Sequence, residues 1–152
     1  MAQTDRAHRY RGSCHCGALE MIFETDRPAE DAPLRACACS FCRRHGMRAT
    51  SDPEGRVQIR VHDPGALRRY RFGLRTADFL LCGICGCYMA AFMEDEAGDR
   101  SVINVNCLDE RDSFAVEAPP VSYDHEDEAG RRARRRAAWT PTELIEEPEA
   151  AS

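Results

Sequence analysis

The sequences Cys14-His15-Cys16, Cys37-Ala38-Cys39-Ser40-Phe41-Cys42 and Cys82-Gly83-Ile84-Cys85-Gly86-Cys87 hold eight of the nine cysteines in this chain. Thiolate sulfur is a soft, anionic ligand that suits zinc. C-x-C and C-x-x-C turns bring two sulfurs onto one tetrahedral ion with little backbone strain. The close spacing within each cluster therefore predicts a zinc-binding protein.

A disulfide framework is the main competing interpretation, because small cysteine-rich domains in oxidising compartments are often cross-linked. The odd number of cysteines weighs against it, and two cysteines separated by one residue are poor disulfide partners for each other. Residues 1–11 also contain no apolar run that resembles a signal peptide. We therefore favour metal over disulfides and expect a cytoplasmic protein, because the reducing cytosol keeps thiols available to metal.

The composition describes one soluble domain with room for a single core, since 43% of the 152 residues are hydrophobic and 31% are charged. The longest apolar run, residues 87–93, is too short to cross a bilayer. A formal net charge of -5 argues against general binding to nucleic acid. These features exclude a membrane-spanning protein and favour small molecules over nucleic acid as partners.

Short strands dominate the hydrophobic pattern. Leu19, Met21 and Phe23 form one alternating series, and residues 57, 59 and 61 form another, as expected for half-buried strands. Further candidates are residues 69–72, 79–81, 88–92 and 102–107, with turn sequences at 26–28, 52–55 and 63–65. The pattern predicts a mainly β domain of short antiparallel strands.

One short helix is predicted late in the sequence, where acidic residues 124–128 precede the arginines of residues 131–136 and so suit the helix dipole. Asp127 with Arg131 and Glu128 with Arg132 have the favourable i,i+4 order, whereas Gly130 weakens the prediction. From residue 141 the sequence is acidic and poor in core residues. We expect a zinc-binding catalytic-type domain over residues 1–140 and a flexible acidic tail over residues 141–152.

Four stretches resemble, in order and spacing, the glutathione-dependent formaldehyde-activating enzyme family, also called the centromere protein V type domain. The resemblance covers about residues 10–125, and Trp139 is a candidate match for a late aromatic residue of the family. The stretches are Gly12-Ser13-Cys14-His15-Cys16-Gly17, Cys37-Ala38-Cys39-Ser40-Phe41-Cys42-Arg43-Arg44, Phe79-Leu80-Leu81-Cys82-Gly83-Ile84-Cys85-Gly86 and Leu108-Asp109.

The resemblance implies a β-rich, Mss4-like fold with two zinc sites of different character. The family pattern places four cysteines around a structural zinc, namely Cys14, Cys16, Cys82 and Cys85. Four thiolates close the coordination sphere, as structural sites require. The second, catalytic site would use only Cys37, Cys39 and Cys42, which leaves one position for water or a substrate thiol.

The activity that the resemblance implies joins glutathione to formaldehyde and gives S-hydroxymethylglutathione, whose reversal is a carbon–sulfur lyase reaction. Glutathione or a similar thiol would place its sulfur at the open zinc position, where the metal lowers the thiol pKa. Arg43 and Arg44 could offset the negative charge of the site or bind a glutathione carboxylate, since guanidinium groups suit carboxylates geometrically. An ordinary solvated role for both arginines remains open.

Several residues depart from the family pattern. Ala38 stands where the family often has histidine, and His45 stands where an aromatic residue commonly follows the paired arginines. His45 could ligate zinc, carry protons or be a polar loop residue. Cys87 could be an alternative ligand, although a small half-buried strand residue is the favoured interpretation. Cys107 is in phase with residues 103 and 105 and is assigned to the core. His15 is assigned to a surface or supporting role.

Two other functional classes stay open. In the first, the chain is a non-catalytic zinc module whose arginines at residues 131–136 bind an acidic partner or nucleic acid, although the neighbouring acidic residues 124–128 would neutralise much of their field. In the second, Cys82 and Cys85 cycle between dithiol and disulfide. That motif normally begins a helix in a βαβ unit, and the sequence predicts no such unit around it.

Overall fold

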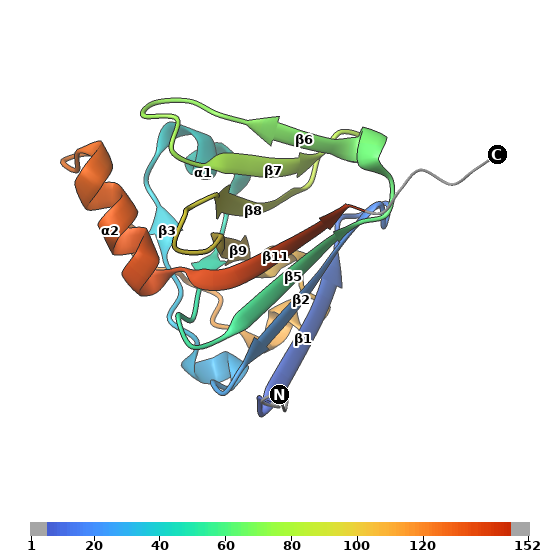
Figure 1. The fold of residues 1–152 in the computed structure, drawn as a ribbon. Coiled ribbons are helices and arrows are strands. Elements are labelled where there is room, and N and C mark those ends of the chain that lie inside the picture. The colour runs from blue at the N-terminus through green and yellow to red at the C-terminus, as the bar shows by residue number, and fades with distance from the viewer. Residues whose placement is uncertain (1–5, 147–152) are drawn as a thin grey trace.

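The computed structural model describes residues 6–146 and confirms a mainly β fold with a short helix late in the sequence (Figure 1). The strands are β1 (His8–Ser13), β2 (Leu19–Thr25), β3 (Ala36–Cys37), β4 (Ala49–Thr50), β5 (Arg56–Val61), β6 (Leu67–Tyr70), β7 (Asp78–Cys82), β8 (Tyr88–Met93), β9 (Arg100–Asn104), β10 (Pro120–Val121) and β11 (Thr140–Glu146). The helices are α1 (Ser40–His45) and α2 (Glu128–Ala138), with 3-10 turns η1 (Ala29–Asp31), η2 (Pro64–Ala66), η3 (Val105–Cys107) and η4 (Arg111–Ser113).

The main sheet has the order β1-β2-β5-β11-β9-β8-β7-β6, and β4 pairs with β9. Its neighbours are antiparallel except for β11, which runs parallel to β5 and antiparallel to β9. One hydrophobic core gathers residues of β2 and β5, such as Phe23 and Ile59, with residues of β8 and β9, such as Met89 and Ile103. The two halves of the sheet therefore pack on each other across this core.

Strand β11 corrects the expectation of a loose tail from residue 141. Residues 142–146 pair with β5, and Thr140 and Pro141 pair with β9, so β11 joins the two halves of the sheet. Thr140 is buried, and its hydroxyl accepts a hydrogen bond from the Asp52 backbone N–H at 2.8 Å. This pairing on both sides provides hydrogen-bond partners for the backbone of β11, although its side chains are mostly polar or acidic. Residues 147–152 of the expected tail lie outside the described residues.

The predicted strands at 19–23 and 57–61 are confirmed as β2 and β5, and the late helix is confirmed as α2. Asp127 caps α2, because its carboxylate accepts the Gly130 N–H at 2.7 Å. The prediction for residues 102–107 was partly wrong, since β9 ends at Asn104 and the chain turns into η3. The Asn104 side chain accepts the Asn106 N–H at 3.1 Å and so caps this turn.

Gly12 is placed where two segments touch backbone to backbone. It forms an isolated bridge with Leu108, and the neighbouring Asp109 N–H donates to the Arg11 carbonyl at 2.8 Å. A Cβ on Gly12 would lie 2.7 Å from the Leu108 Cα and would collide with the Cys107 carbonyl oxygen. Only glycine permits this approach of the two backbones.

We expect Gly12→Ala to lower the free energy of unfolding by about 1–3 kcal/mol, because the backbone around Leu108 must move to admit the methyl group. Gly65→Ala is the matched control, since a Cβ there meets nothing closer than the Asp63 carboxylate at 3.4 Å. Urea denaturation measures both variants. Equal stability of the two would contradict the close approach.

Truncation after Trp139 should remove cooperative unfolding, because it leaves unpaired the edges of β5 and β9 that β11 occupies. Truncation after Glu146 keeps the whole strand and is the control. Thermal unfolding followed by circular dichroism distinguishes the two chains. A cooperative transition in the shorter chain would show that β11 is dispensable.

Candidate metal centres and the adjoining cavity

The first group of thiols joins two turns that are distant in the sequence. Cys14 and Cys16 lie in the turn between β1 and β2, while Cys82 ends β7 and Cys85 lies in the turn that leads to β8. Their four sulfur atoms lie within 4.8 Å of one another. The structure therefore brings together the four residues that the sequence predicts around the closed site.

Backbone amides surround these sulfurs. The Leu19 N–H points to the Cys14 Sγ at 3.3 Å, and the N–H groups of Ile84 and Cys85 each lie 3.4 Å from the Cys82 Sγ. Gly17 and Gly86 follow the two pairs with φ values of 86° and 82°, which let both turns curl back tightly. Amide donors favour thiolates, the form of cysteine that binds metal.

The spacing of the sulfurs fits zinc. A tetrahedral ion with Zn–S bonds of about 2.3 Å separates its ligands by about 3.8 Å. The Cys16 Sγ lies 3.7 Å from the Cys14 Sγ and 3.5 Å from the Cys82 Sγ. Four thiolates at this spacing would fill the coordination sphere.

The second group lies at the beginning of α1. Cys37 ends β3, Cys39 precedes the first residue of α1, and Cys42 is buried in its first turn; their sulfur atoms also lie within 4.8 Å of one another. The Cys42 N–H donates to the Cys39 Sγ at 3.3 Å, so a ligand candidate also caps the helix. Hydrogen bonds from Cys37 and Cys42 lower the pKa of Cys39 to about 2. Hydrogen bonds with Cys37 and then Cys39 raise the pKa of Cys42.

Tyr88 is a neighbour of this group that the sequence analysis missed. It is the first residue of β8, and its hydroxyl lies 3.5 Å from the Cys42 Sγ. Burial, and then the nearby Cys42, raise the pKa of Tyr88 well above its usual range, so the hydroxyl stays protonated. The signal was available, because a tyrosine inside an apolar strand needs a polar partner for its hydroxyl.

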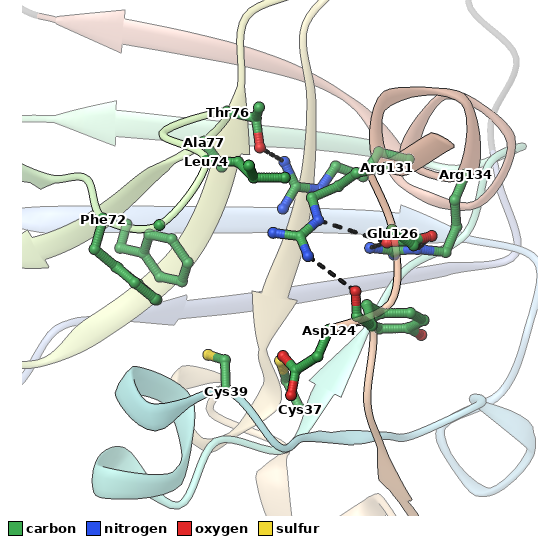
Figure 2. Close-up of a pocket in the computed structure, with 14 residues that line it drawn as sticks. Cys37, Cys39, Phe72, Leu74, Thr76, Ala77, Asp124, Glu126, Arg131 and Arg134 are labelled. Atoms are coloured by element: carbon green, nitrogen blue, oxygen red, sulfur yellow. Dashed lines mark hydrogen bonds and ion pairs between the residues drawn. The ribbon is translucent and has the colours of Figure 1, made fainter. Parts of the chain in front are cut away.

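A cavity of about 340 Å³ opens beside the second group. Figure 2 shows Cys37 and Cys39 on one side of it and Arg131 and Glu126 on the other. Its remaining walls are Phe72, Gly73, Leu74, Thr76, Ala77, Phe79, Tyr123, Asp124, Arg134 and Arg135. Cys37 and Arg135 also line a smaller recess of about 60 Å³ that reaches Cys42, Tyr88 and Trp139.

The basic wall of this cavity comes from α2. Arg134 makes two hydrogen bonds to the Glu126 carboxylate, at 2.8 and 3.0 Å, and stacks over the Tyr123 ring. Arg131 donates to the Tyr123 carbonyl at 2.9 Å, and Arg135 donates to the Thr76 hydroxyl at 2.7 Å. Burial, and then the charges of Arg134 and Arg131, lower the pKa of Arg135 to about 10, so it remains a cation at neutral pH. The sequence predicted this helix but not which of its arginines face inward.

Arg43 and Arg44 lie elsewhere. Both are exposed on α1 and neither lines the cavity beside Cys39; Arg44 donates to the Ser40 carbonyl of its own helix at 2.8 Å. Arg43 borders a separate hollow of about 530 Å³ that also touches Cys37 and Cys42. A role for them in binding glutathione therefore stays a prediction.

The remaining candidate residues lie near the two thiol groups but belong to neither. His15 is exposed in the first turn, and its backbone N–H points to the Cys87 Sγ at 3.4 Å. His45 is exposed at the end of α1, with its ring centroid 4.6 Å from that of Phe41. Cys107 is partly buried against the core, and burial raises its pKa to about 12.

Comparison with known proteins relates these features to a family. The family described as glutathione-dependent formaldehyde-activating enzyme matches residues 9–123, which include both thiol groups. A crystal structure of a protein from Rhodobacter sphaeroides is 33% identical to this chain with a TM-score of 0.54, and the alignment covers 73% of this chain and 99% of that one. No curated protein matches at a significant level. Because the family match spans well over half of the sequence, the chain belongs to the glutathione-dependent formaldehyde-activating enzyme family.

Proposed function

We propose that this protein binds two zinc ions and uses the second to join a thiol, such as glutathione, to formaldehyde. The observation that carries the proposal is a group of three thiols that faces a cavity of about 340 Å³. A three-thiolate site leaves one tetrahedral position for a substrate, whereas the four-thiol group is complete without one. Membership of the family supports glutathione and formaldehyde as the reactants.

Zinc at Cys37, Cys39 and Cys42 would lower the pKa of a thiol placed at the open position. In the reaction, the thiol gives up its proton, its sulfur bonds to the carbonyl carbon, the π electron pair moves to oxygen, and the oxygen takes a proton to give S-hydroxymethylglutathione. The reverse reaction breaks the same carbon–sulfur bond, which is the lyase direction. Phe72 and Phe79 would limit water at the reacting sulfur, and the Tyr88 hydroxyl would hold Cys42 in place.

The environment of α2 supports small molecules over nucleic acid as partners. Arg136 makes two hydrogen bonds of 2.9 Å to Asp95, and Arg132 forms an ion pair with the same carboxylate at 3.6 Å. Arg134 is held by Glu126. These three arginines are paired in this way, so they offer few free charges to phosphates. A redox role for Cys82 and Cys85 is also disfavoured, because they lie at a strand end and in a turn among four thiols rather than at a helix start.

None of the helices within residues 6–146 is both long and apolar enough to span a bilayer. We propose that the protein acts in the cytoplasm, where reducing conditions keep all seven candidate ligands as thiols.

Replacement of one closed-site ligand tests the structural zinc. We expect Cys85→Ser to reduce the zinc content from about two ions per chain to about one and to lower the melting temperature by about 10 °C or more, because the metal joins two distant turns. Cys87→Ser is the matched control, since Cys87 lies beside this group but outside it. Elemental mass spectrometry and thermal unfolding measure both effects. Equal losses in the two variants would make Cys87 a ligand.

Replacement of one open-site ligand tests the reaction. We expect Cys39→Ser to retain one zinc ion and to lose at least about 100-fold in the rate of S-hydroxymethylglutathione formation, measured above the uncatalysed rate by exchange NMR with ¹³C-formaldehyde. Cys107→Ser, outside both thiol groups, should keep both zinc and rate. A wild-type protein with two zinc ions and no acceleration would refute the enzymatic proposal.

A further inference from the structure

The cationic wall of the cavity comes from a part of the chain that the family match does not cover. The match ends at residue 123, whereas α2 comprises Glu128–Ala138. Arg131, Arg134 and Arg135 of this helix line the same cavity as Cys37 and Cys39. What this wall binds is therefore a property of this chain that the family description does not supply.

Arg135 is buried without an acidic partner. Its exposed fraction is 7%, its Nη1 donates to the neutral Thr76 hydroxyl, and its guanidinium lies 4.6 Å from the centre of the Trp139 ring. Within residues 6–146, no carboxylate forms an ion pair with it, and its Nε has no hydrogen-bond partner. The charge of Glu126 favours this cation without forming an ion pair with it, so an anion that bound directly to Arg135 would lower the cost of burying it further.

The other arginines of α2 show the contrast. Arg132 and Arg136 share Asp95, and Arg134 occupies the Glu126 carboxylate with two hydrogen bonds. Arg132 and Arg136, which do not line the cavity, and Arg134, which does, therefore each have a carboxylate beside them. The unpaired charge is found on the face that lines the cavity.

Arg131 adds to this surplus. Its Nη2 donates to the Tyr123 carbonyl, and its Nε lies 3.5 Å from the Glu126 oxygen that Arg134 already uses. One carboxylate thus serves two guanidinium groups. Asp124 is the other carboxylate on the wall and is exposed, so three arginines share the cavity with two carboxylates and with the thiols of Cys37 and Cys39. In Figure 2 the Asp124 carboxylate lies on the cysteine side, away from Arg131.

We propose that Arg135 and Arg131 bind a carboxylate of the thiol substrate, so that α2 makes the site selective for thiols that carry a carboxylate. The proposal rests on the proposed function in placing the sulfur of that substrate at Cys37, Cys39 and Cys42. Guanidinium groups bind carboxylates through paired N–H donors, and the Nε of Arg135 is a buried donor without a hydrogen-bond partner. Phe72, Leu74 and Phe79 form the apolar wall along which the rest of the substrate lies.

Calorimetry with the zinc-loaded protein tests the carboxylate separately from the chemistry. The probe is S-methylglutathione, which keeps both carboxylates of glutathione but has no free thiol. We expect it to bind, and its dimethyl ester to bind about tenfold or more weakly, because the ester removes the negative charges. Failure of S-methylglutathione to bind, or equal binding of the ester, would overturn the proposal.

Two substitutions assign the effect to α2. Arg131→Gln should weaken S-methylglutathione binding about tenfold or more and leave ester binding unchanged, whereas Arg136→Gln, on the same helix but paired with Asp95, should change neither. Arg135→Lys keeps the buried charge and removes the Nε–H donor, so it should also weaken binding of S-methylglutathione. Its thermal unfolding should remain cooperative, which shows that the variant is folded. Wild-type affinity in both Arg131→Gln and Arg135→Lys would overturn the assignment.

The same variants separate this proposal from the proposed function. If the wild-type protein gives no acceleration with formaldehyde but binds S-methylglutathione in an arginine-dependent way, carboxylate binding stands and the enzymatic function fails. If the wild-type protein accelerates the reaction and the KM for glutathione is unchanged in Arg131→Gln and Arg135→Lys, the function stands and carboxylate binding is overturned.

Discussion

Four sulfur atoms from two distant turns meet at one place in this fold. The turn after β1 belongs to the first hairpin of the sheet, and the turn after β7 belongs to its opposite half, yet their thiols lie within 4.8 Å of one another. Both halves must therefore curl over the shared core before the four sulfurs can meet. A metal ion bound here would hold the two halves of the sheet in this arrangement. Two short turns have too few apolar contacts to do so as strongly.

The two thiol groups differ in their surroundings. The first is formed by two turns whose backbone amides point to its sulfurs, and none of its four cysteines lines the cavity beside Cys39. The second takes its sulfurs from a two-residue strand and a short helix, and it faces residues contributed by the segment before β7 and by α2. Distant segments thus line a cavity beside the open group, as expected where a substrate must be recognised as well as bound.

The sequence was most informative where spacing alone determines geometry. C-x-C and C-x-x-C pairs predict which sulfurs meet, and the alternation in residues 19–23 and 57–61 predicts which side chains form the core. Strand β11 escaped prediction because its stability comes from backbone pairing on both edges rather than from its acidic side chains. The arginines that face the cavity could not be predicted. The order of charges predicts a helix, but it does not show which face of that helix packs against Thr76 and Trp139.

The position of β11 also has a consequence for how the molecule folds. Val57 of β5 pairs with Thr142, and Ser101 of β9 pairs with Thr140, so the middle of the sheet joins residues that are far apart along the chain. Contacts of such high sequence separation close large loops and slow the search for the native state. Hairpins such as β1–β2 and β7–β8 pair residues that are close in the sequence and can form early, whereas the middle of the sheet is complete only when residues 140–146 have joined it.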